Sequence, residues 1–261
     1  MERLFLIAAT VCFLATFAYT MFALGARVAR PSRWNFVVML VGFALLTGFL
    51  QLRGKAVGRC PVTNLFEVLV FLSWAVVLLY FVVGGTYRLS LLGAFTAPFV
   101  FLLLVVAQLL PAASHAPVYK KSAGMWPELH AALSLIAFGA FALSCVAGVM
   151  FLVQERHLKR HNLDSVFHAL PPIHDLDAAM QRVMSAGFTL LTVGLLAGFL
   201  AGNMKAHLAA IWTAGVVWLI YAVLLILRRT HRFPARRIAW MSVGAFTIVL
   251  GTLWGLSFMH L

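Results

Sequence analysis

The chain has 261 residues, of which 63% are hydrophobic and only 10% are charged, and its formal net charge at pH 7 is +13. The apolar residues lie in long runs, so the composition excludes an ordinary soluble domain and is typical of a polytopic membrane protein. In a soluble chain this charge would suggest a nucleic acid partner. Here the cations lie in loops beside apolar runs, where they orient the chain and contact anionic headgroups, so no nucleic acid partner is predicted.

Eight apolar runs are long enough to cross the hydrocarbon core as helices, which takes about 20 residues. The predicted spans are about 3–24, 34–51, 65–84, 89–110, 127–153, 178–201, 207–227 and 238–259. The first run exceeds the apolar part of a signal peptide, so we expect it to remain as a helix. The predicted fold class is all-α: one membrane domain over residues 1–261, formed by a bundle of eight transmembrane helices.

Positive charges are distributed unevenly between two sets of loops. The segments after the first, third, fifth and seventh predicted spans contain thirteen lysines and arginines, and the other loops and ends contain seven. Because Lys and Arg near span ends prefer the cytoplasmic side, both the N-terminus and the C-terminus are predicted to lie outside.

Three histidines are placed near the outer surface by this topology, although they are far apart in the sequence. His130 begins the fifth predicted span, His207 begins the seventh and His260 ends the eighth, and His115 lies in an outside loop. A neutral imidazole is a common axial ligand of haem iron, so these residues are candidates for a haem site. The alternative for any one of them is an interfacial ring that is partly hydrated.

The start of the third predicted span adds an acidic candidate. Thr63 or Asn64 can cap this helix, and Glu67 follows in its first turn, where a carboxylate is favoured by the helix dipole. An acid at the edge of a span is also a functional candidate, and both explanations stay open. Arg53, Arg59 and four lysines of the outside loops lie where haem propionates would project, with lipid headgroups as the alternative partners.

Two other kinds of site are not predicted. The three cysteines form no CxxC pair, which argues against thiol redox chemistry; they are Cys12, Cys60 and Cys145. Four histidines of the longest cytoplasmic connection lack the compact spacing of a metal site; they are His157, His161, His168 and His174.

Three blocks carry a family resemblance: CPVTNLFEVLVFLSWAVVLLY, WPELHAALSLIAFGAFALSCVAGVMFLVQERHLK and GFTLLTVGLLAGFLAG. Together they resemble the cytochrome c assembly protein family, which includes CcsA-, CcmC- and HemX-like proteins, over nearly the whole chain. The resemblance implies a haem-handling bundle of the bacterial inner membrane. It implies that His130, preceded by Trp126, and His260 are the haem-iron ligands.

The sequence also departs from the family. Members that deliver haem have a tryptophan-rich segment ending in Trp-Asp between the spans that correspond to the sixth and seventh here, and this chain lacks it. In this respect it is more similar to the small YpjD-like branch, in which a histidine opens the seventh span, as His207 does.

Two functions follow as expectations. In the first, the protein binds or presents haem at the outer face, with apocytochrome c or other assembly proteins as partners. The thiols of apocytochrome c would attack the haem, so no catalytic residue is predicted and an assembly factor is favoured over a stand-alone catalyst. In the second, the protein is regulatory or accessory and contacts a partner through its basic loops, 154–176 and 228–237. A b-type cytochrome is not favoured, because the middle of every span lacks histidine.

Overall fold

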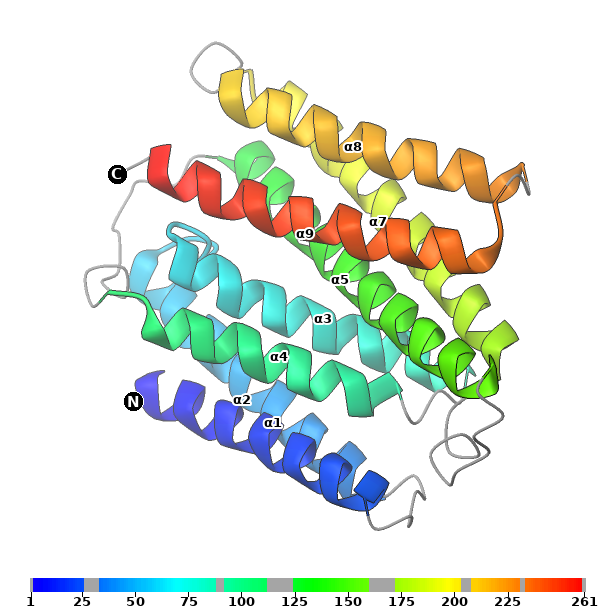
Figure 1. The fold of residues 1–261 in the computed structure, drawn as a ribbon. Coiled ribbons are helices and arrows are strands. Elements are labelled where there is room, and N and C mark those ends of the chain that lie inside the picture. The colour runs from blue at the N-terminus through cyan, green and yellow to red at the C-terminus, as the bar shows by residue number, and fades with distance from the viewer. Residues whose placement is uncertain are drawn as a thin grey trace.

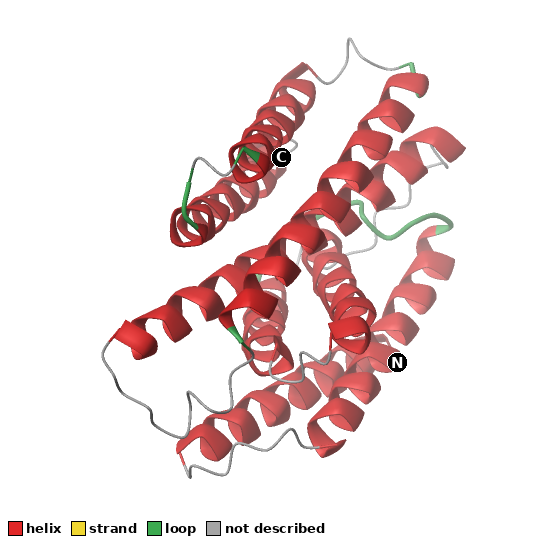
Figure 2. Ribbon diagram, turned by 90° about the vertical axis from the view of Figure 1, so that its right-hand side faces the viewer, coloured by secondary structure: helices red, strands yellow, loops and turns green. Residues whose placement is uncertain are grey.

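The computed structural model describes residues 2–25, 33–87, 92–111, 124–159, 172–202, 208–230 and 233–259. Over these ranges the chain forms eight α-helices and no strand (Figures 1 and 2). In chain order they are α1 (Glu2–Gly25), α2 (Arg33–Val57), α3 (Leu65–Tyr87), α4 (Leu92–Leu109), α5 (Met125–Lys159), α7 (Ile173–Leu200), α8 (Leu208–Arg229) and α9 (Ala235–Met259). The predicted all-α membrane bundle is confirmed.

Seven of these helices are long and apolar enough to cross a membrane. The described apolar stretch of α4, Phe95–Leu109, is shorter. This helix also contains Pro98, which has no N–H for the helical hydrogen-bond pattern. The fourth predicted span is therefore present as a helix, and it differs from the other seven in the length of its apolar part.

Several helices extend beyond the predicted spans, and in two of them, α5 and α7, ion pairs hold the polar ends. The last turn of α5 is held by Glu155, which accepts from Lys159 Nζ at 2.7 Å and from Arg236 Nε, on α9, at 3.3 Å. Early in α7, Asp177 pairs with Arg228 of α8. Hydropathy alone ends a span where the charges begin, whereas these paired charges keep the polar turns helical.

The long helix α5 is the centre of the bundle. It packs most extensively against α7, and it also contacts α3, α4 and α9. Figure 1 shows α5 between a group formed by α1 to α4 and a group formed by α7 to α9. Most of the apolar stretch of α5 is buried, whereas only a small part of the apolar stretch of α8 is, as expected for a helix whose outer face contacts lipid.

Alternating helix directions bring distant segments to one end of the molecule. In Figure 1, α1, α3 and α5 begin at the same end, and α9 ends there. We call this end the His130 end, because His130 lies in the first turns of α5. Glu67, in the first turn of α3, lies there too. Both residues therefore lie at one end of the bundle. The predicted convergence of His130 with His207 and His260 stays a prediction, because those two histidines lie outside the described residues, and so does the exposure of this end to the outside.

Candidate functional site

Close contact between α5 and α7 depends on glycines of α7. A Cβ added at Gly187 would lie 2.8 Å from Phe141 Cε1, and one added at Gly194 would lie 3.0 Å from Ser134 Oγ. Small residues let two membrane helices approach backbone to backbone. The α7 backbone therefore lies directly against the face of α5 that includes His130.

The His130 ring is held by this backbone. Its Nδ1 lies 2.7 Å from the carbonyl oxygen of Gly194. A carbonyl only accepts hydrogen bonds, so Nδ1 carries the proton and the neutral ring keeps its lone pair on Nε2. Histidines that bind metals commonly donate their other N–H to a backbone carbonyl in this way, which fixes both the tautomer and the ring orientation.

Gly198 supplies the space for the ring. A Cβ at this position would lie 2.7 Å from His130 Nδ1 and 3.1 Å from its Cε1. Trp126 lies one turn before His130, on the same side of α5, and its side chain is 40% exposed. The site therefore combines an oriented imidazole with an exposed indole at the beginning of one helix.

Gly198→Ala should destabilise the protein, because the added methyl group overpacks the His130 ring at a cost of about 1–3 kcal/mol. The matched control is Gly215→Ala in α8, where a Cβ meets nothing within 4 Å. That change should be neutral or stabilising by up to about 1 kcal/mol through helix propensity. Thermal unfolding in detergent measures both, and equal stabilities of the two variants would contradict the packing described here.

Glu67 lies at the start of α3 and is fully buried. Its backbone N–H donates to Asn64 Oδ1 at 2.9 Å, so Asn64 is the capping residue of the two that the sequence left open. Its Oε2 accepts from the N–H and the hydroxyl of Thr63, at 2.8 and 2.7 Å. Its Oε1 accepts from Arg53 Nε at 2.8 Å. Thr63, the residue before the cap, thus accounts for one carboxylate oxygen, and Arg53 accounts for the other.

Arg53, one of the cations predicted to lie in outside loops, is instead buried in the bundle. Its side chain is 2% exposed, and Nη1 donates to Glu2 Oε1 at 3.0 Å in addition to the Glu67 bond. The guanidinium also lies 5.9 Å from the centre of the Phe66 ring. Two carboxylates occupy Arg53, so it faces neither a propionate nor a lipid headgroup, and its role lies inside the protein.

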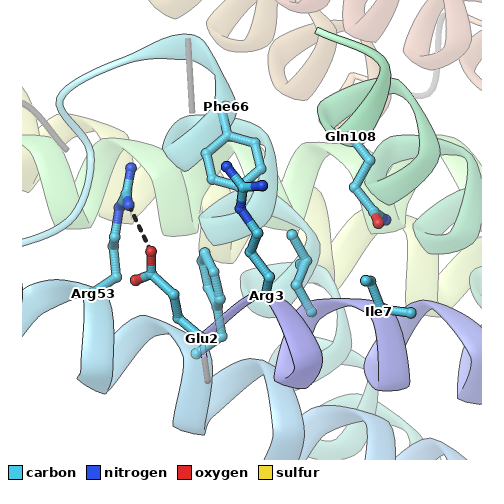
Figure 3. Close-up of a pocket in the computed structure, with 8 residues that line it drawn as sticks. Glu2, Arg3, Ile7, Arg53, Phe66 and Gln108 are labelled. Atoms are coloured by element: carbon cyan, nitrogen blue, oxygen red, sulfur yellow. Dashed lines mark hydrogen bonds and ion pairs between the residues drawn. The ribbon is translucent and has the colours of Figure 1, made fainter. Parts of the chain in front are cut away.

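A pocket of about 170 Å³ adjoins this ion pair between α1, α2, α3 and α4. Figure 3 shows Arg53 and Glu2 meeting at one side of it and Gln108 at the other, with Arg3 and Ile7 rising from α1 between them. Ligand pockets usually measure about 300–1,000 Å³. This smaller space is better described as a gap beside α1 than as a site for haem.

The loop between α2 and α3 carries Arg59 and Cys60. Arg59 Nε is buried and has no hydrogen-bond partner among the described residues. Burial raises the pKa of the Cys60 thiol; the charges of Glu128 and Glu67 raise it further, and Arg59 lowers it. The loop leads into α3, whose first turn lies at the His130 end, and Glu128 lies in the first turn of α5 at the same end.

Of the other predicted site residues, His207 and His260 lie outside the described residues, as does His115. Their roles stay predictions. Sequence reasoning did not find Arg53 as a buried partner of Glu67, nor the α7 glycines. The spacing of Gly187, Gly194 and Gly198 places them along one helix face, and this pattern could have indicated their close packing against another helix.

Residues 62–260 match the family described as Cytochrome C assembly protein. The chain belongs to this family. Among curated proteins it is similar to Protein HemX of Brevibacillus brevis, with 29% identity over 67% of this chain and 64% of the relative. It is also similar to Cytochrome c biogenesis protein CcsA of Chlamydomonas reinhardtii, with 26% identity over 82% of this chain and 62% of the relative. The chain thus spans less than two thirds of the length of these two relatives.

A third relative covers more of both proteins. It is Cytochrome c biogenesis protein CcsA of Synechococcus sp. (strain CC9902), 27% identical over 85% of this chain and 83% of the relative. The predicted family is confirmed, and the protein is a multi-pass membrane protein. The family match begins at residue 62, so α1 and α2 precede it and both Glu67 and His130 fall within it.

Proposed function

We propose that this protein handles haem in cytochrome c biogenesis, holding it at the His130 end for transfer to apocytochrome c. The observation that carries the proposal is the hydrogen bond from His130 Nδ1 to the Gly194 carbonyl oxygen, at 2.7 Å. It leaves Nε2 as the free nitrogen, which is the arrangement that suits an imidazole for iron ligation.

Haem is the cargo in this proposal, and each residue has a separate task. His130 ligates the iron through Nε2, and His260 or His207 supplies the second imidazole. Arg59, whose Nε lacks a partner among the described residues, pairs with a propionate. Trp126 offers an exposed apolar surface beside the ligand. The thiols of apocytochrome c add to the haem vinyl groups, so the protein contributes ligation and orientation, not a nucleophile.

The test is a visible absorption spectrum with pyridine haemochrome quantitation of the protein purified in detergent. We expect about one haem per chain. Absence of haem after loading would reject the proposal.

A second candidate function is that of an accessory protein which contacts other membrane proteins and holds no haem. The short connection between α7 and α8 favours it, because it contains no tryptophan-rich segment. The similarity to Protein HemX is compatible with it. In this alternative the basic segments 154–176 and 228–237 form the contact surface, and the haem measurement separates the two candidates.

A further inference from the structure

The N-terminal hairpin formed by α1 and α2 lies before the part of the chain that matches the family. Within the described residues, α1 packs on α2 and α4, while α2 packs extensively on α1 and only sparsely on α3. One specific contact between α2 and α3 is the hydrogen bond from Trp74 Nε1 to Thr47 Oγ1, at 2.9 Å. Another is the ion pair of Arg53 with Glu67, at the His130 end.

The ion pair between Arg53 and Glu67 is almost completely removed from solvent. Arg53 is 2% exposed and Glu67 is fully buried. Arg53 also holds Glu2 in the first turn of α1, so one guanidinium joins three helices. Close to Glu2, the gap shown in Figure 3 separates α1 from its neighbours, and beyond the gap Gln108 of α4 donates to Thr10 Oγ1 of α1 at 2.8 Å. The two carboxylates and Arg53 are therefore the main polar connection at this end of the hairpin.

Glu67 transmits this connection to the loop between α2 and α3. While Oε1 binds Arg53, Oε2 accepts both hydrogen bonds from Thr63. The other end of the loop is fixed by Gly58, whose N–H donates to the Gly54 carbonyl oxygen at 2.8 Å and whose φ of 74° suits glycine. Between these anchors lie Arg59 and Cys60, at the same end of the bundle as the first turn of α5.

We propose that the Glu2–Arg53–Glu67 ion network is a positioning device. Through it the N-terminal hairpin fixes the loop of residues 58–64 against the start of α5, and so aims Arg59 toward ligand held at His130. Arg53 and Glu67 are positioning residues here, because they act on Arg59 through Thr63 and the loop backbone. The consequence for haem rests on the proposed function, whereas the position of the loop does not.

Cys60 reports the position of the loop without haem. Iodoacetamide alkylates the thiolate, so the pH midpoint of the reaction rate reports the thiol pKa and the alkaline plateau reports access. In a Cys12→Ala, Cys145→Ala background, the unaltered loop should give a low plateau and a midpoint above that of a free thiol, about 8.5. Glu128→Gln should lower the midpoint, because it removes a charge that raises the pKa of the Cys60 thiol.

Variants of the network should instead change access. Glu67→Gln and Arg53→Gln are expected to raise the plateau rate several-fold, because Thr63 and the loop lose their anchor. Thr63→Val removes one donor without leaving an unpaired buried charge, and it should raise the plateau while the protein stays well folded. Arg3→Gln removes an exposed cation next to Glu2 and should leave the plateau unchanged. A plateau in Thr63→Val and Glu67→Gln equal to that of the parent would overturn the proposal.

The link to haem is read separately. In protein that carries haem, Glu67→Gln should reduce haem occupancy, and Thr63→Val should reduce it less. Arg59→Gln should also reduce haem occupancy, but it should not raise the plateau rate of Cys60 alkylation. If haem occupancy is unchanged in the variants that raise the plateau rate, the proposal that the loop positions Arg59 toward haem is overturned. Lack of haem in the parent protein would reject the proposed function, and the Cys60 rates would still decide whether the hairpin fixes the loop.

Discussion

His130→Ala is expected to lower haem occupancy by at least about tenfold, because iron ligation by imidazole is a large part of what holds haem in a histidine site. The oriented Nε2 and the absence of any other described histidine in the same part of α5 make this the most sensitive single position. Pyridine haemochrome quantitation after loading with a fixed haem excess measures the effect. Free imidazole added to His130→Gly should restore the ligated spectrum, since it occupies the space of the missing ring.

The matched control for this prediction is His174→Ala. His174 lies in the first turn of α7, at the opposite end of the bundle, and its side chain is 92% exposed. The His174→Ala substitution removes the same chemical group as His130→Ala and should leave haem occupancy unchanged. Equal losses in the two variants would show nonspecific binding of haem to histidines, and no loss in His130→Ala would exclude His130 as a ligand. A parallel His260→Ala variant tests the second ligand that family resemblance implies.

Long apolar runs were sufficient to predict the helices, because a segment in lipid must satisfy its backbone hydrogen bonds internally. Chain direction was predictable as well, because each helix crosses the membrane in the direction opposite to the helix before it. The third and fifth spans therefore begin at the same end, which brings Glu67 and His130 together there. The ends of α5 and α7 were less predictable. Glu155 and Asp177 stay in helices because they pair with Lys159 and Arg228, and such pairing depends on tertiary neighbours.

The candidate site was predictable in its titratable residues and not in their partners. A histidine at the start of a span is visible in the sequence, but its hydrogen bond to Gly194 involves a backbone carbonyl, which no residue type reveals. Arg53 was placed by sequence among cations that contact propionates or headgroups. Its burial follows from the meeting of α1, α2 and α3, each of which contributes one charge. Hydropathy cannot distinguish an arginine in the interface from one enclosed by carboxylates.

Glu67→Gln is expected to lower the free energy of unfolding by about 3–5 kcal/mol, the usual cost of leaving one partner of a buried ion pair without its counter-charge. Arg53→Met should cost a similar amount, because Glu67 then stays buried with only Thr63 as donor. The double variant Arg53→Met, Glu67→Met should cost clearly less than the sum, since it removes both charges and fills the space with apolar groups. Unfolding in mixed detergent micelles measures all three.

The control for this cycle is Glu155→Gln at the opposite end of the bundle. Glu155 also binds two cations, but Lys159 and Arg236 are 60% and 53% exposed, so solvent screens their charges. Losing these exposed partners should cost only about 0–1 kcal/mol. Additive costs in the Arg53 and Glu67 cycle, or a loss at Glu155 as large as at Glu67, would contradict a network whose strength comes from burial. The contrast between the two glutamates therefore isolates the contribution of desolvation, since both accept bonds from two neighbouring groups and differ in how far their partners lie from water.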